Sequence, residues 1–271
     1  MAHNGQRFRG LLVSVCTVFL LVASAWPASA ASGDQSPGSS SIQPPPANAD
    51  FFLGRPRATV GLRGSWVFAS AGSDIFDFVT QHLTLEKSSF NTASLGTEFG
   101  INVAPRLDLM LGFDASKSTT PSHYREKSEP VGDRFLPIEQ TTSLKEAIFS
   151  AGFKFALLSP GRRVSRYAWI PSRVAPYVGA GAGVINYDFE QVGDFVDFAD
   201  DRIFTSTFRS KGWAPSAHLL GGADIHVFRR VFMSIEGRYT FSSAKLDRDF
   251  IDFEPIDLKG FRFGAGLHYA F

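Results

Sequence analysis

Apolar residues alternate with small or polar residues, at a period of two, along most of the chain beyond residue 56. In the first such segment, apolar residues alternate with Thr59, Arg63 and Ser65 on the other face. A period of two is that of a β-strand, because successive side chains point to opposite faces of a sheet. Eight segments share the pattern: 57–69, 93–104, 107–116, 147–157, 177–189, 216–227, 231–241 and 261–271. They are longer than the ~5–6 residues of an average soluble strand, and they fit the ~9–11 residues of a tilted membrane-spanning strand.

The two faces of these predicted strands differ in size as well as polarity. One face is bulky and apolar, whereas the other carries glycine, small polar residues and a few charges. A soluble barrel turns its bulky apolar face inward, but a narrow membrane barrel does the reverse. We therefore predict an all-β fold, an eight-stranded antiparallel up-and-down transmembrane β-barrel over residues 56–271. The facing of 177–189 stays open, because two apolar sets of opposite parity compete, and a β-bulge would reconcile them.

The predicted connections alternate between short and long. Short connections lie at 105–106 and 228–230, and an intermediate one lies at 159–173. The long connections lie near 70–92, 117–139, 190–211 and 244–258. The short side carries arginine without acidic residues, whereas the long loops are acidic in sum. Short turns on one side and long loops on the other are typical of outer-membrane barrels, and a basic rim suits phospholipid headgroups.

The first residues predict a secretory signal. Basic residues precede an apolar core at 11–23, and Ala-Ser-Ala at 28–30 offers the small residues that a signal peptidase reads. This core is too short to span a membrane well. We assign 1–30 to the signal peptide and 31–55, which is rich in Ser, Gly and Pro, to a flexible tail.

The composition excludes several classes of protein. The chain has 271 residues, with 27 Lys and Arg against 26 Asp and Glu. Nucleic-acid binding would need a basic surplus, so we expect no nucleic-acid partner. The single cysteine excludes a disulfide scaffold and any multi-cysteine metal site, and we predict no cofactor.

The segment 261–271 carries the most specific pattern. Phe263, Leu267, Tyr269 and Phe271 lie on its apolar face. With the signal peptide, the strand number and the loop asymmetry, the chain resembles the small eight-stranded outer-membrane barrels of the outer membrane protein A, X and W type. The resemblance implies a place in the outer membrane of a Gram-negative-type envelope, with its lipids and lipopolysaccharide as partners. It also implies that the terminal aromatic residue is an assembly signal for the outer-membrane insertion machinery, and no peptidoglycan-binding domain is expected.

The inward face of the predicted barrel carries nearly balanced charge. The expected lumen network contains Arg63, Glu98, Asp114, Lys154, Glu236, Arg238 and Arg262. Glu98 should lie roughly opposite Asp114, with Arg63 at a height to join them. A second cluster is expected from neighbouring strands: Glu236, Arg238 and Arg262. An eight-stranded barrel is just wide enough for its own side chains, so we expect these ion pairs to fill the lumen, and the alternative is a thin wet channel.

Three long loops share a motif in which two aspartates bracket two apolar residues and a phenylalanine follows. Its aspartates are Asp74, Asp77, Asp194, Asp197, Asp249 and Asp252. The simpler interpretation puts the aspartates in water and the phenylalanines in the outer aromatic girdle. Oxygen ligands suit Ca²⁺ or Mg²⁺, so the six aspartates are weak candidates for a metal site, and otherwise we predict none. Residues 74–83 also fit a short amphipathic helix.

We expect a structural or surface-interaction protein that acts through its long acidic loops, with a lumen plugged by ion pairs. The alternative is a narrow pore, or a lateral transport path for small hydrophobic molecules that the resemblance to outer membrane protein W allows. A lipid A-modifying enzyme is the third class. Its candidate groups are His82 and the pair Ser122-His123, but no nucleophile-elbow motif is present, so we predict no catalytic residue. The sequence leaves the oligomeric state open.

Overall fold

The structure is a computed structural model that describes residues 52–165 and 168–271. The expected signal peptide and the tail up to residue 51 lie outside the described residues. Phe52–Leu53 (β1), at the end of the segment expected to be a tail, pair with Ala168–Pro171 (β7), which also pairs with Gly161–Arg163 (β6). The ring of Phe52 stacks on Trp169 at 5.4 Å and is buried.

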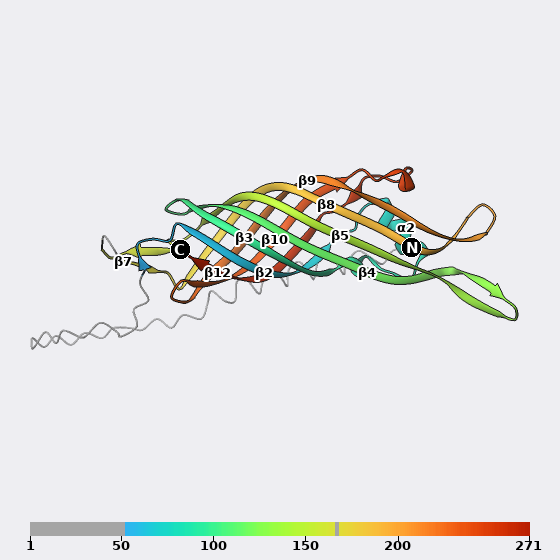
Figure 1. The fold of residues 1–271 in the computed structure, drawn as a ribbon, viewed down its shortest axis with the longest axis horizontal. Helices are drawn as coiled ribbons and strands as arrows, with labels where there is room; N and C mark the ends of the chain where they lie inside the picture. The colour runs from blue at the N-terminus through green and yellow to red at the C-terminus, as the bar shows by residue number, and fades with distance from the viewer. Residues whose placement is uncertain (1–51, 166–167) are drawn as a thin grey trace, which may run out of the picture. The chain divides into compact units, whose positions relative to one another are not determined.

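Within the described residues, eight long strands form a closed antiparallel ring (Figure 1). They are β2 (Ala58–Ala69), β3 (Thr92–Ala104), β4 (Leu107–Val131), β5 (Arg134–Ala156), β8 (Val174–Val196), β9 (Ile203–Phe228), β10 (Val231–Ala244) and β12 (Gly260–Ala270). Each strand pairs with the next, and β12 pairs with β2 to close the ring. The expected eight-stranded up-and-down topology is therefore confirmed.

The two ends of the ring differ. At the turn end, two-residue turns join β3 to β4 and β9 to β10, and the small sheet of β1, β7 and β6 lies there (Figure 1). At the opposite, loop end lies the helix α2 (Asp74–His82). The remaining short elements are the 3₁₀ helices η1 (Lys87–Phe90) and η2 (Arg248–Phe250), and β11 (Ile256–Asp257), which pairs with β10.

Two of the expected long loops are strands instead. Most of 117–139 belongs to the β4–β5 hairpin, and much of 190–211 belongs to the β8–β9 hairpin. Both hairpins project at the loop end (Figure 1). Ser, Thr, Val and Phe recur there, and a ladder that has started in the barrel continues through residues of good β propensity without needing lipid on its outer face.

The open facing of 177–189 resolves without a bulge. Tyr177, Ile185 and Tyr187 are buried inside the ring, whereas Val178 and Val184 are exposed on its outside. The ladder between β5 and β8 runs through this segment without a shift of register. Both apolar sets therefore have a place in the barrel: one faces the lumen, which contains apolar residues here, and the other faces outward.

The outside of the ring is a belt of exposed apolar side chains. Its most exposed members include Leu62, Leu95, Phe153, Trp213 and Leu267. An apolar surface this extensive is unfavourable in water, and it matches the lipid-facing band of a membrane barrel. Beyond the belt, toward the loop end, the outward residues become charged: Lys117, Lys145, Asp188, Arg209 and Lys211.

No helix among the described residues is long and apolar enough to cross a membrane.

Candidate functional site in the lumen

Arg63, in the middle of β2, points into the lumen and binds three carboxylates from three other strands. Its Nη1 lies 3.0 Å from Glu98 Oε2 and 3.1 Å from Glu236 Oε1, and its Nη2 lies 2.8 and 2.7 Å from the two oxygens of Asp114. The Asp114 contact is charge-assisted, and both carboxylate oxygens accept from Nη2, which fixes the guanidinium in the lumen. Gly96 lies opposite Asp114 in the β3–β4 ladder, and a Cβ there would collide with the carboxylate.

Arg238, on β10, binds the same three carboxylates. Its guanidinium lies 2.9 Å from Glu236, 3.4 Å from Glu98 and 3.7 Å from Asp114. The hydroxyl of Tyr177 donates to Glu236 Oε2 at 3.1 Å. We call Arg63, Glu98, Asp114, Glu236 and Arg238 the central network. All five residues are at most 7% exposed, so each charge depends on the others for compensation.

The register that brings Glu98 to Asp114 differs from the expected one. Glu98 pairs with Gly112, and Asp114 pairs with Gly96, so the two carboxylates are diagonal neighbours and do not face each other. The ladder has an irregularity of register just before the β3–β4 turn, which shifts every pair beyond it. Diagonal neighbours remain within reach of a long side chain, so Arg63 still joins them.

The expected second cluster does not form. Glu236 and Arg238 belong to the central network, whereas Arg262 binds Glu146 at 2.7 Å and donates to Thr240 Oγ1 at 3.1 Å. Arg238 and Arg262 lie directly opposite each other in the β10–β12 ladder. Like charges in this position repel, so the two guanidinium groups bind different carboxylates.

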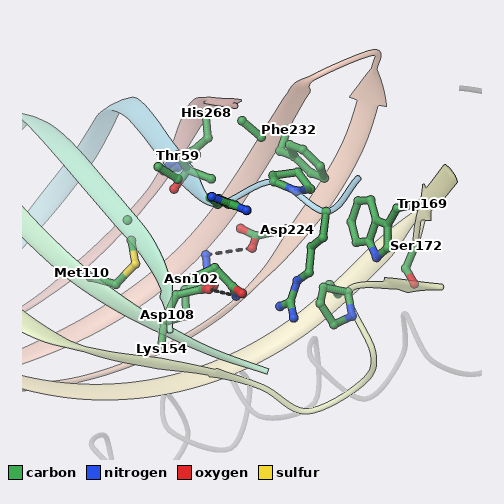
Figure 2. Close-up of a pocket in the computed structure, with 18 residues that line it drawn as sticks. Thr59, Asn102, Asp108, Met110, Lys154, Trp169, Ser172, Asp224, Phe232 and His268 are labelled. Atoms are coloured by element: carbon green, nitrogen blue, oxygen red, sulfur yellow. Dashed lines mark hydrogen bonds and ion pairs between the residues drawn. The ribbon is translucent and has the colours of Figure 1, made fainter. Parts of the chain in front are cut away.

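The turn end of the lumen contains a pocket of about 90 Å³, lined by both charged and apolar side chains (Figure 2). Lys154 Nζ lies 2.7 Å from Asp224, and Asn102 Nδ2 donates to Asp108 at 2.6 Å. Lys154, expected in the network, is thus paired one level nearer the turn end. Trp169 of β7 also lines this pocket, so the small sheet borders it.

The loop end of the lumen is filled by apolar side chains. Ile75, Phe76 and Val79 of α2 are buried to 1% exposure or less. The ring of Phe76 lies 4.7 Å from Phe90 and 6.1 Å from Phe189, both edge to face. The apolar face of the helix therefore packs inside the loop end of the ring, and we call this packed helix the apolar plug.

Sequence reasoning missed this plug, although it proposed a helix at 74–83. The strands that surround α2 carry Ile148, Ile185 and Phe189 on the inward face, which elsewhere is small and polar. Bulky apolar residues on the polar face near a long loop were the available signal. They indicate that an apolar segment enters the barrel.

Comparison with known proteins finds solved structures of low similarity. No family model and no curated protein matches the chain. Among solved structures, Neisserial surface protein A aligns at 14% identity and a TM-score of 0.44, over 79% of this chain and 97% of that one. The outer membrane protein OprG from Pseudomonas aeruginosa aligns at 13% and 0.44 (81% and 99%), and Ail, the attachment invasion locus protein of Yersinia pestis, at 11% and 0.40 (80% and 100%). Likeness at this level says nothing about ligand or activity.

The identification rests on the chain's own geometry. A closed antiparallel ring, an apolar belt outside and buried charges inside are the arrangement that lets a sheet cross a bilayer without open edges. The chain is an eight-stranded transmembrane β-barrel. This is the fold that the resemblance to the small barrels of the A, X and W type implies.

The barrel does not bring the six loop aspartates together. Five of them bind separate partners: Asp74 the Glu254 backbone N–H, Asp77 Lys87, Asp194 the Thr205 hydroxyl, Asp197 the Ala199 backbone N–H and Asp249 the Arg209 backbone N–H. In the described ranges, no group of three or more acidic, histidine or cysteine side chains is placed to hold a metal ion.

The candidate hydrolytic groups also bind separate partners. Ser122 Oγ donates to the backbone oxygen of Gln140 at 3.3 Å, and His123 Nδ1 lies 3.3 Å from Thr84 Oγ1. The ring of His82 instead lies tilted against that of Phe78, with ring centroids 4.6 Å apart. Each of the three residues thus contacts a different partner at the loop end of the barrel.

The expected assembly residues lie on the outside of β12. Phe263, Leu267, Tyr269 and Phe271 are all exposed on the belt. Phe271 N–H donates to Ala58 O at 2.9 Å, so this residue is held against β2 at the turn end.

Proposed function

We propose that this barrel is a non-conducting surface protein of the outer membrane, whose lumen is sealed and whose loop end makes its contacts. The observation that carries the proposal is the binding of three carboxylates by Arg63, because the four side chains come from β2, β3, β4 and β10 and meet inside the ring. An eight-stranded ring has little room beyond its own side chains. A network that spans this width supports a plug and not a pore.

The loop end supports a contact role. The hairpins β4–β5 and β8–β9 extend beyond the belt, and their ends carry exposed apolar residues such as Phe135 and Phe198. Just beyond the belt, Lys117, Lys145 and Lys211 point outward. We propose that these lysines bind phosphate groups of lipopolysaccharide, whereas the acidic loops above them face other partners.

A solute-permeation assay tests the sealed lumen. Proteoliposomes that contain the wild type should not swell in isotonic arabinose or glycine, because the central network closes the path to both. A variant with all five network residues replaced by alanine and α2 replaced by a Gly-Ser linker should swell. Swelling of wild-type vesicles at porin-like rates would contradict the proposal.

The contact role has a separate test. The hairpin end 128–137 pairs only with itself, so its replacement by a two-residue turn should leave the barrel folded. We expect the variant to retain the heat-modifiable electrophoretic shift that marks a folded barrel. Cells that carry it should bind less to lipopolysaccharide-free surfaces or to other cells. The matched variant shortens 197–202, the end of the β8–β9 hairpin. If cells that carry either variant bind as well as wild type, a surface role for the hairpins is contradicted.

We also propose that the outward face of β12 directs assembly. Phe271→Ser removes an aromatic group from the belt at the turn end, and we expect less folded barrel in the outer membrane and more degraded chain in the periplasm. Phe155→Ser is the matched control, because Phe155 is outward and exposed near the same end on β5. Equal membrane levels of both variants would contradict the assembly role.

A further inference from the structure

The phenylalanines of the repeated loop motif do not join the aromatic girdle. Phe78, Phe198 and Phe253, one from each repeat, instead meet at the loop end around a cavity of about 220 Å³. The ring of Phe78 lies 6.1 Å from Phe198 and 5.6 Å from Phe253, edge to face in both cases. Three loops far apart in the sequence thus supply the same residue to one aromatic cavity.

The cavity is open to the outside. Phe198 is 51% exposed and Phe78 is 37% exposed, so they form a rim, whereas Tyr124, Phe195 and Phe250 are buried and form the floor. An apolar protein cavity of ~150 Å³ holds a benzene molecule. This cavity therefore has room for a molecule of one or two rings, which would pack edge to face on its walls.

One polar group in the lining lacks a partner. Gln140 is 4% exposed, and its side-chain oxygen Oε1 has no hydrogen-bond partner in the described part of the chain. A buried amide oxygen without a donor is unfavourable, so a ligand that brings an N–H or O–H group is favoured there. The acidic residue of the lining, Asp249, already accepts the backbone N–H of Arg209 at 2.9 Å, and its charge disfavours an anionic ligand.

We propose that this cavity binds a small neutral aromatic molecule that carries one N–H or O–H donor, of the indole or phenol class. The ring packs among Phe78, Phe198 and Phe253, and the donor binds Gln140 Oε1. The site lies at the loop end beyond the central network, so binding does not depend on whether the lumen conducts.

Calorimetric titration of the full barrel in lipid nanodiscs tests the proposal, with empty nanodiscs subtracted. The probes are indole and indene, which have nearly the same shape but differ in the N–H group. Wild type should bind indole about tenfold more tightly than indene, the expected effect of one hydrogen bond to a buried acceptor. Gln140→Leu should abolish this preference while indene still binds.

The aromatic walls have their own variants. Phe198→Ala should weaken both probes about tenfold, whereas Phe135→Ala, an exposed ring outside the cavity, should change neither. Retention of the heat-modifiable shift establishes that each variant is folded. Three results would each overturn the proposal. They are no binding of indole at millimolar concentration, equal affinity of wild type for the two probes, and no change in either affinity on Phe198→Ala.

Discussion

At the scale of the residue, the barrel depends on charges that neutralise one another out of water. Arg63 binds three carboxylates, and Arg238 approaches the same three, so two cations balance most of three anions at no more than 7% exposure. Removal of one member leaves the others buried and uncompensated, which costs far more than loss of an exposed ion pair.

Arg63→Met should therefore lower the free energy of unfolding by about 3–5 kcal/mol. Urea titration in lipid vesicles, followed by tryptophan fluorescence, measures it. Arg202→Met is the matched control, because Arg202 is exposed at the loop end and should change stability by less than about 0.5 kcal/mol. Addition of Asp114→Asn to Arg63→Met should recover part of the loss, and a loss below about 1 kcal/mol in the single variant would contradict a compensated network.

Asp188 gives a prediction in pH, outside the membrane belt. Hydrogen bonds from Arg209, at 2.7 Å from Nε and 2.6 Å from Nη2, hold the pKa of the Asp188 carboxyl below its ordinary value, against desolvation. A lowered folded pKa stabilises the fold above the unfolded value of about 4, and this stability is lost as pH falls toward the folded pKa.

Asp188→Asn should accordingly destabilise the barrel at pH 7, and the difference from wild type should shrink toward zero as the pH falls below about 4. Unfolding midpoints at pH 7, 4 and 2.5 measure this difference. A constant difference across the three values would mean that the carboxylate charge is not the cause.

At the scale of the element, alternation predicts which face of a strand meets lipid, but it does not predict how far each ladder runs. The period of two placed Arg63, Glu98 and Arg238 on the inward face, as the structure has them. It could not predict the partner of Arg262, because Glu146 lies on β5, which does not pair with β12, and the contact depends on how the ring closes. The docking of α2 also lies beyond the pattern, since it depends on the space that the strands leave.

The plug formed by α2 gives a prediction at this scale. Phe76→Ala removes a fully buried ring between Phe90 and Phe189, and it should lower the free energy of unfolding by about 3–5 kcal/mol. Gln81→Ala, on the exposed side of the same helix, is the control and should have little effect. Equal free energies of unfolding for the two variants would show that packing of the helix against the barrel contributes little to stability. The same unfolding assay serves both.

At the scale of the whole barrel, buried side chains lie in the lumen at successive levels, and the proposed seal rests on them. Apolar residues of α2 fill the loop end, the central network spans the middle, and the ion pair of Lys154 with Asp224 lies toward the turn end. An ion that crosses would have to displace buried salt bridges and then apolar side chains. The arrangement therefore favours a barrel that uses its outer surfaces and not its interior.

Ion current through wild-type barrels in a planar lipid bilayer tests this most directly. Folded protein, verified by its electrophoretic shift, is added at high salt, and current is recorded at low voltage for many insertions. The barrel should give no steady conductance, whereas the variant without α2 and without the central network should give stepwise currents. Steady, uniform current steps from the wild type would contradict the sealed lumen.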